Sequence, residues 1–246
     1  MPVSAEQVLD RAFHARYDCD LRMTVDLEVM TSDRHTLGRR LDVATKQIGD
    51  RLHTLAVFTD PAELRRTKLL TVESSERDDD QFIYLPSLRR VRRVSSAQRG
   101  DAFMGTDLVY EDFERRRKED YEASFAPDPK TESEPIWWVS AEPHFESSYE
   151  RVEFVIAQRD AAILEIRYYR RGATAPFKRT TMPRRSFRSG EGCVLPTEML
   201  VENLETGTST RVVIEELEIG AEIDDRTFSA ATLESRDGLP KASASQ

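Results

Sequence analysis

The chain has 246 residues, of which 39% are hydrophobic and 33% charged, and its formal net charge is −9. This composition is typical of a folded globular protein and excludes an intrinsically disordered one. No run of eighteen apolar residues occurs, which argues against a transmembrane helix. The acidic total argues against a nucleic-acid-binding protein, because such proteins depend on positive potential.

The chain begins with a predicted helix. Ser4 is an N-cap residue with Gln7 at the capping-box position, and the apolar residues between positions 8 and 13 share one face. We expect this helix to end near Tyr17. The opening stretch MPVSAEQVLD has no secretion signal, which leaves open a cytoplasmic protein and a protein whose signal has been removed.

After the helix the period of the apolar residues changes to two. In LRMTVDLEV, residues 21–29, every odd position is apolar and every even position is polar, which predicts a half-buried antiparallel strand. Four further strands are predicted in the first half, at 36–48, 51–58, 67–73 and 81–85.

The second half of the chain repeats this pattern. Strands are predicted at 136–141, 151–157, 162–170, 176–188, 193–203 and 209–219. About eleven strands with little helix between them indicate a mainly β protein, a barrel or a sandwich. We expect one domain over residues 1–235, and a disordered polar tail over residues 236–246.

Motifs for catalysis or metal binding are missing from the sequence. The four histidines have no His-x-x-x-His spacing, and neither a nucleophile elbow nor a phosphate-binding loop is present. We therefore predict a protein that is not an enzyme and has no metal or cofactor. The two cysteines, Cys19 and Cys193, are far apart, and both a disulfide and two free thiols stay open.

The run LRRVRRV, residues 88–94, does not fit a regular half-buried strand, because neither face would be apolar. It indicates a sheet edge or a bulge. Such a basic edge is either a solvated edge that prevents aggregation or a docking surface for anionic headgroups or an acidic partner. The arginines that would make these contacts are Arg89, Arg90, Arg92 and Arg93.

The stretch FMGTDLVYEDF, residues 103–113, has no strand period and carries several acids. A general acid–base pair and a calcium site are both conceivable for these carboxylates. The interpretation we favour is that Asp107 and Glu111 hold nearby arginines or cap local backbone.

The sequence over residues 82–113 resembles the larger branch of the LolA-like family of outer-membrane lipoprotein-sorting proteins. Its members have an aromatic-rich strand that ends in Leu-Pro-x-Leu, then Arg-x-x-Arg, then Phe-x-Gly-x-Asp-x-x-Tyr-Glu-Asp. The resemblance continues through the Gly-rich hairpin of residues 189–219 and the segment IDDRTFSAATL, residues 223–233. The matching central residues are Leu85, Pro86, Leu88, Arg90, Arg93, Phe103, Gly105, Asp107, Tyr110, Glu111 and Asp112.

The resemblance implies an incomplete antiparallel β-barrel around an apolar cavity, closed by a helical lid. It implies a periplasmic carrier of lipid or lipoprotein acyl chains, with an RND-type (MmpL-like) inner-membrane exporter and an outer-membrane acceptor as partners. An envelope sensor or adaptor that docks a membrane partner is the alternative.

The resemblance also assigns roles to residues. Residues 95–113 would form the lid or its anchor, with these residues as lid and hinge: Gly100, Phe103, Gly105, Asp107, Tyr110, Glu111 and Asp112. We expect the cavity to be lined by Leu21, Met23, Val25, Leu27, Val29, Tyr84, Phe103, Val152, Phe154, Ile156, Leu164, Ile166 and Tyr168.

Overall fold

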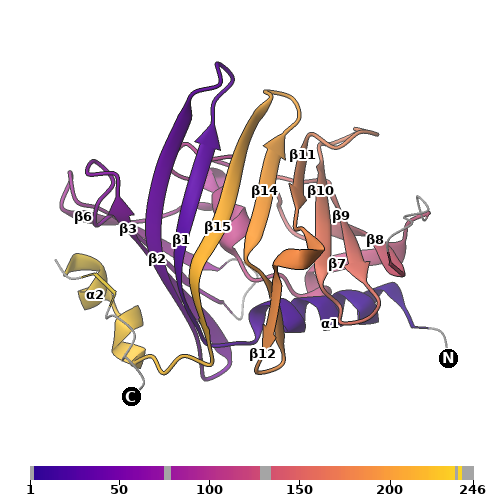
Figure 1. The fold of residues 1–246 in the computed structure, drawn as a ribbon, viewed down its shortest axis with the longest axis horizontal. Coiled ribbons are helices and arrows are strands. Elements are labelled where there is room, and N and C mark those ends of the chain that lie inside the picture. Colours follow the sequence, from indigo (N-terminus) through magenta and orange to yellow (C-terminus); the bar gives the residue numbers. More distant parts are fainter. Residues whose placement is uncertain (1–2, 75–78, 128–133, 236–237, 240–246) are drawn as a thin grey trace.

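The structure, a computed structural model, describes residues 3–74, 79–127, 134–235 and 238–239. Its main element is one antiparallel sheet of thirteen strands, hereafter the large sheet, in the order β6-β5-β4-β3-β2-β1-β15-β14-β11-β10-β9-β8-β7. Figure 1 shows this sheet with α1 packed below its second half. The mainly β, unclosed architecture predicted from the sequence is confirmed.

The strands of the large sheet follow the chain outward to one edge and then return from the other. The first half contains β1 (Leu21–Met30), β2 (Thr36–Ile48), β3 (Arg51–Asp60), β4 (Lys68–Val72), β5 (Asp80–Leu85) and β6 (Arg90–Arg93). The second half contains β7 (Tyr121–Phe125), β8 (Ile136–Pro143), β9 (Arg151–Ala157), β10 (Ile163–Tyr169), β11 (Lys178–Thr181), β14 (Glu198–Asn203) and β15 (Thr208–Ile219).

Two further strands, β12 (Phe187–Gly190) and β13 (Cys193–Pro196), form a separate hairpin. The described residues thus contain fifteen strands, more than the expected eleven or so. The predicted strands 176–188 and 193–203 are each divided, the first after Thr181 and the second after Pro196. Proline explains these breaks, because Pro183 and Pro196 have no backbone N–H to donate to a ladder.

The predicted N-terminal helix is confirmed as α1 (Ala5–Tyr17). Ser4 caps it and forms the capping box with Gln7. The apolar face of the helix, which includes Leu9 and Phe13, packs on the inner face of β7 to β10 in one buried cluster. The helix therefore covers the second half of the large sheet.

Residues 94–120, hereafter the crossing segment, join the two edge strands β6 and β7. They contain three short 3₁₀ helices, η1 (Ser96–Gln98), η2 (Tyr110–Phe113) and η3 (Lys118–Asp120). In Figure 1 this magenta segment lies behind the central strands. It contacts the inner face of the first half of the sheet, the half that α1 leaves uncovered.

The outer face of β2 to β5 is covered by the C-terminal part of the chain. Residues of η5 (Asp225–Phe228) and α2 (Ala230–Glu234) pack there on Leu55, Val57 and Leu70. The crossing segment covers the inner face of β3, and the C-terminal elements cover its outer face. This explains why apolar residues occupy both faces of the strand. Leu239 also contacts this cluster, and the rest of the predicted tail, 236–237 and 240–246, lies outside the described residues.

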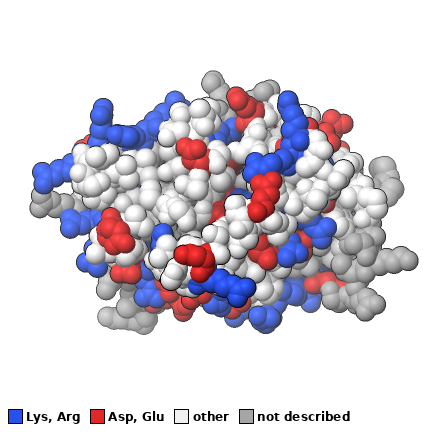
Figure 2. All heavy atoms as spheres, turned by 90° about the horizontal axis from the view of Figure 1, so that it is seen from above, with Lys and Arg blue, Asp and Glu red and all other residues white. Residues whose placement is uncertain are grey.

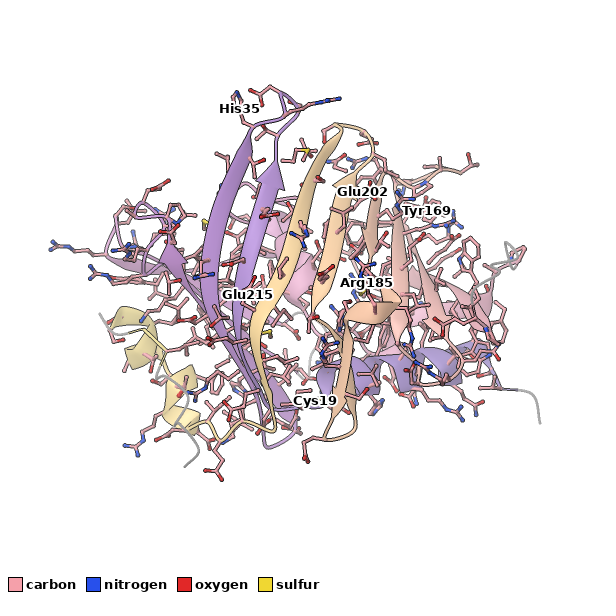
Figure 3. The ribbon with its side chains drawn as sticks, in the orientation of Figure 1. Cys19, His35, Tyr169, Arg185, Glu202 and Glu215 are labelled. Carbon is pink, nitrogen blue, oxygen red and sulfur yellow. A yellow bond between two sulfur atoms is a disulfide. The ribbon has the colours of Figure 1, made fainter. Side chains whose placement is uncertain are left out.

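Cys19 and Cys193 form a disulfide with a Cα–Cα distance of 6.3 Å. It ties the end of α1 to the β12–β13 hairpin, at the lower end of the view in Figure 3. Leu21 and Leu195 pack around it in a small buried cluster. Of the two alternatives that the sequence leaves open, the structure has the disulfide.

We expect the disulfide to contribute strongly to stability, because it closes a loop between residues 174 positions apart. Chain-entropy arguments give about 5 kcal/mol for a loop of this length, as an upper value. Reduction, or replacement of both cysteines by serine, should therefore lower the free energy of unfolding by about 3–5 kcal/mol in urea titrations. The double serine variant is the control, since added reductant should leave it unchanged. Equal stability of the oxidised and reduced protein would contradict the expectation.

Candidate ligand-binding cavity

An apolar cavity of about 270 Å³ lies between the inner face of the large sheet and the elements that cover it. Its wall is made by alternate residues of neighbouring strands, as expected for one face of a pleated sheet. In the first half these are Leu21, Met23, Val25, Leu27, Leu41, Val43, Thr45, Leu52, Thr54, Ala56, Leu69 and Thr71. In the second half they are Ile166, Tyr168, Thr180, Met199, Val201, Val212, Ile214 and Leu217.

The opposite face of the same strands is polar. Asp26 of β1 pairs with Arg40 of β2 at 2.6 Å, and Arg179 of β11 pairs with Glu202 of β14 at 2.8 Å. Figure 3 shows Glu202 and Glu215 on this outer face. A bulge at residue 215 interrupts the pairing of β1 with β15, and the inward positions continue on both sides of it.

Seven of the thirteen predicted lining residues lie on the cavity wall. They are Leu21, Met23, Val25, Leu27, Phe103, Ile166 and Tyr168. Their role as ligand contacts stays a prediction.

The other six predicted lining residues lie elsewhere. Three belong to the cluster under α1, namely Val152, Phe154 and Ile156, because the helix occupies the space in front of them. Val29 continues the inward face of β1 above the wall, and Leu164 sits at an irregularity of the β9–β10 pairing. Tyr84 shares its strand face with Phe82, which packs on the outer cluster.

Three apolar residues of the crossing segment close the cavity on the side opposite the large sheet, namely Phe103, Leu108 and Phe113. Phe103 is only 1% exposed. Its ring centroid lies 4.7 Å from that of Phe113 and 5.6 Å from that of Phe58 on β3. The segment thus fills much of the interior with its own aromatic side chains.

Phe103 is held at the base of a tight turn, hereafter the 102–109 turn. An isolated bridge joins Ala102 to Val109, and the backbone N–H of Phe103 donates to the carbonyl of Leu108 at 2.8 Å. Gly105 has φ +73°, a conformation that disfavours other residues. Its predicted importance has this physical basis, although its part in any motion is untested.

Asp107 attaches this turn to β15. Its carboxylate accepts hydrogen bonds from the hydroxyls of Thr208, at 2.5 Å, and Thr210, at 2.8 Å. Its backbone N–H donates to Thr210 Oγ1 at 2.9 Å. On β2, Arg39 Nε donates to the carbonyl of Met104 at 3.0 Å. Of the side chains that hold the 102–109 turn to the sheet, Thr210 is buried, whereas Asp107, Thr208 and Arg39 are partly exposed.

The flanks of the turn are attached more firmly, to the loop before β9. Glu111 is 5% exposed and accepts hydrogen bonds from Ser147 Oγ and, at 2.7 Å, from the backbone N–H of Ser148. A Cβ atom on Gly100 would lie 2.8 Å from Ser148 Oγ. Gly100 therefore permits close packing against Ser148. A further attachment is the hydrogen bond that Gln81 of β5 donates to the carbonyl of Tyr110 at 2.9 Å.

The flanks also carry buried ion pairs. Arg99 and Glu114 form a bidentate pair, with Nε to Oε1 at 2.9 Å, and both residues are buried. Glu73, at the end of β4, accepts hydrogen bonds from Arg115 at 3.0 Å and from Arg117 at 2.8 Å. Burial would raise the pKa of Glu73, but hydrogen bonds from the Leu52 backbone N–H and these two arginines outweigh it and lower the pKa.

Sequence reasoning missed the polar end of the cavity. Its lining there includes Arg16 from α1 and Asp112, Arg115 and Arg116 from the crossing segment. Asp112 accepts hydrogen bonds from Lys178 Nζ, from Tyr149 Oη at 2.8 Å and from the Val109 backbone N–H at 2.9 Å. The sequence signal for this site was the run ERRRKED, residues 114–120. In an extended segment the middle one of its three arginines points to the opposite side from the other two.

The predicted basic edge is confirmed as the edge strand β6. Arg89 lies in the β5–β6 turn with φ +47°, and Arg90, Arg92 and Arg93 are exposed. Arg93 pairs with Asp80. Figure 2 shows Lys and Arg gathered at the end of the molecule where Figure 1 places β6. Their role in docking a partner stays a prediction.

Within the described ranges, no group of three or more His, Cys, Asp or Glu residues is arranged to hold a metal ion. No helix among the described residues is long and apolar enough to cross a membrane.

The burial of Asp79 predicts a pH-dependent stability. Burial raises the pKa of Asp79 to about 6, although backbone N–H groups of Arg115 and Ser74 donate to it at 2.9 and 3.1 Å. The pKa of the unfolded chain is about 3.9, so the native state binds the extra proton between these values, and stability rises as the pH falls from 7 to 4.

This contribution amounts to at most about 3 kcal/mol. The Asp79→Asn variant should lack it and show a flatter pH profile in urea titrations between pH 4 and 7. Loss of one backbone hydrogen bond will lower its stability at every pH, so the slope is the diagnostic quantity. Identical slopes for the two proteins would contradict the prediction.

Several solved structures share this fold. An outer membrane lipoprotein-sorting protein domain from Vibrio parahaemolyticus is 21% identical, with a TM-score of 0.86 over 94% of this chain and 98% of that chain. A DUF1329 family protein from Desulfovibrio piger is 22% identical, with a TM-score of 0.83 over 94% and 100%. A LolA superfamily protein from Nitrosomonas europaea is 16% identical, with a TM-score of 0.73 over 94% and 100%.

No curated protein matches the sequence. One protein-family model, described as "Uncharacterized protein", matches residues 50–235, which is most of the chain. The chain therefore belongs to that family, and its fold is the fold of the LolA-like lipoprotein-sorting proteins, as the resemblance in its sequence predicted.

Proposed function

We propose that the protein is a carrier that binds the acyl chain of a lipid or lipoprotein in its cavity and passes it between components of the cell envelope. The observation that carries this proposal is the continuous apolar wall, built from alternate residues of β1 to β4, β10, β14 and β15. The similarity to a lipoprotein-sorting domain supports the same class of cargo.

The hydrophobic effect supplies the driving force for such binding. Each methylene removed from water contributes about 0.8 kcal/mol, so ten methylenes contribute about 8 kcal/mol. A cavity of about 150 Å³ is enough for one benzene molecule, so 270 Å³ has room for roughly ten carbon atoms. One medium-length chain fits the cavity as it stands, and longer or multiple chains need more space.

The 102–109 turn is the part that we propose moves to make this space. Exposing Phe103 costs roughly 2–3 kcal/mol, and each hydrogen bond to the Asp107 carboxylate costs roughly 1.5–3 kcal/mol. Detaching the flanks would also separate the buried Glu73 from Arg115 and Arg117, at about 3–5 kcal/mol for each ion pair. Opening the flanks as well as the turn would cost more than opening the turn alone, so we propose that the turn opens while its flanks stay attached.

The disulfide and the fold support a location in the periplasm as part of the proposal. Disulfides persist in oxidising environments such as the bacterial periplasm and are rare in the cytosol. The Cys19–Cys193 bond therefore supports a periplasmic location. A carrier that crosses an aqueous compartment between two membranes also needs the enclosed apolar interior described above.

The proposal assigns no chemical step to the protein. The side chains that are candidate nucleophiles or acids have structural contacts instead. Cys193 is in the disulfide, Asp107 binds two threonines, and Glu111 binds Ser147 and the Ser148 backbone.

Filling the cavity should weaken lipid binding. Met23 lines the wall and is partly buried, so Met23→Trp places a larger side chain in the space that the acyl chain would occupy. We expect at least tenfold weaker binding of a fluorescent fatty acid, or about 1.4 kcal/mol. Glu28→Trp, on the exposed face of the same strand, is the matched control and should bind normally. Normal binding by a folded Met23→Trp protein would count against the cavity as the lipid site.

A membrane partner is the second part of the proposal. An RND-type inner-membrane exporter is the partner that the family resemblance implies, with an outer-membrane protein as acceptor. The exposed arginines of β6 are the surface we assign to the exporter, because an open strand edge offers unpaired backbone groups as well as charge.

Charge reversal on this edge should separate docking from lipid binding. The double variant Arg90→Glu/Arg92→Glu should fail to retain the exporter in pull-downs from solubilised membranes and should bind the fatty acid normally. The control Arg159→Glu/Arg171→Glu makes the same charge change at two exposed turns of the other half. The assignment would be contradicted if the edge variant still retained the exporter, or if it lost both the exporter and the fatty acid. Capture of a signalling protein instead would favour an envelope sensor or adaptor.

A further inference from the structure

Arg116 differs from its two neighbours in the sequence. The backbone is extended on both sides of it, with φ/ψ of −77°/145° at Glu114 and −120°/150° at Arg117, so successive side chains point to opposite sides. Arg115 and Arg117 reach Glu73 on one side. Arg116 points to the other side. Both Arg115 and Arg116 line the cavity, but only Arg115 is paired with Glu73.

The charge of Arg116 is buried and incompletely paired. Its side chain is 8% exposed, and no described residue accepts a hydrogen bond from its Nη1. Its nearest carboxylate oxygen, Asp112 Oδ1, lies 3.8 Å from Nη2. Asp112 is also the partner of Lys178, so one carboxylate faces two buried cations.

Two aromatic rings flank this guanidinium. Its central carbon lies 5.6 Å from the ring centroid of Phe154 and 5.5 Å from that of Tyr168. These contacts fix its orientation, but they do not replace hydrogen-bond acceptors. A buried guanidinium with an unsatisfied donor atom is costly, and a bound anion that accepts from Nη1 would remove this cost.

A second cation lines the same end of the cavity. Arg16 of α1 is partly buried, and its two Nη atoms face sulfur atoms, Met182 Sδ at 3.8 Å and Met199 Sδ at 3.6 Å. Thioethers are weak acceptors. Arg16 therefore keeps most of its capacity to bind an anion.

We propose that Arg116, assisted by Arg16, is the receptor for the anionic group of the cargo, so that the ligand is an amphiphile with one carboxylate or phosphate at the end of a hydrocarbon chain. The chain lies along the wall of β1 to β4, and the anion meets the two guanidinium groups at the polar end of the same cavity. This inference rests on the proposed carrier function and narrows the cargo class.

Three ligands with the same ten-carbon chain test the inference: decanoate, decyl phosphate and decanol. Titration calorimetry at pH 8 should show wild-type protein binding at least one of the two anions tenfold or more tightly than decanol. Whichever anion binds more tightly identifies the source of the headgroup, a fatty acid or a phospholipid-like ester.

The variant Arg116→Met keeps the apolar stem but removes the charge. It should lose the preference for anions and bind decanol as wild-type protein does. Arg16→Met should reduce the preference in the same direction, and it keeps the inference testable where Arg116→Met fails to fold. Arg40→Met, on the outer face of β2, is the control for loss of one arginine.

The outcomes separate the two proposals. Binding of decanol and both anions with equal affinity, or an unchanged preference in the folded arginine variants, would overturn the inference and leave the carrier intact. Failure of wild-type protein to bind any of the three ligands would overturn the carrier function itself.

Discussion

The inner face of the large sheet is apolar across its width, and the rest of the structure depends on how this face is kept from water. A closed barrel would solve the problem by packing the face against itself. Here β6 and β7 stay apart in the described structure, and two other elements cover the face. Helix α1 fills the second half, and the crossing segment covers the first. The cavity is the space that these two covers leave between them.

The crossing segment is attached to the rest of the molecule in two ways, and the proposed opening of the cavity depends on the difference between them. Its flanks are attached to the rest of the molecule by buried ion pairs with Glu73 and by the hydrogen bonds of Glu111 with Ser147 and Ser148. The buried Arg99–Glu114 pair joins the two flanks to each other. Such groups are expensive to separate, because each partner would remain buried and charged. The 102–109 turn between them depends mainly on Phe103 and on Asp107. If Phe103 is displaced, the free energy lost by exposing its ring is largely recovered when the hydrocarbon chain of the ligand is buried in the same place.

Much of this fold was predictable from the period of the apolar residues. Met23 and Val25 point inward because the alternation in β1 is unbroken, and Ser4 marks the start of α1 by its capping box. Long-range packing was not predictable in this way. Phe154 has the same local pattern as Val25, yet it is covered by α1. A strand pattern shows that one face is buried, but it does not show what buries it.

Irregular positions account for the other differences. Tyr84 lies on a strand in which both faces are covered, so its local sequence does not indicate which side points inward. Arg116 was hidden in a charged run, where burial is the exception. Only the contacts of Arg115 and Arg117 show that the middle arginine has a different environment.

The most direct test of the account is native mass spectrometry of the protein purified from periplasm without detergent, followed by organic extraction and identification of the bound lipid. The account predicts one lipid per protein, released together with unfolding. The Met23→Trp variant, whose cavity is filled, should be purified without this lipid. A protein that is empty as purified, and that stays empty after incubation with lipid vesicles and fatty acids, would contradict it.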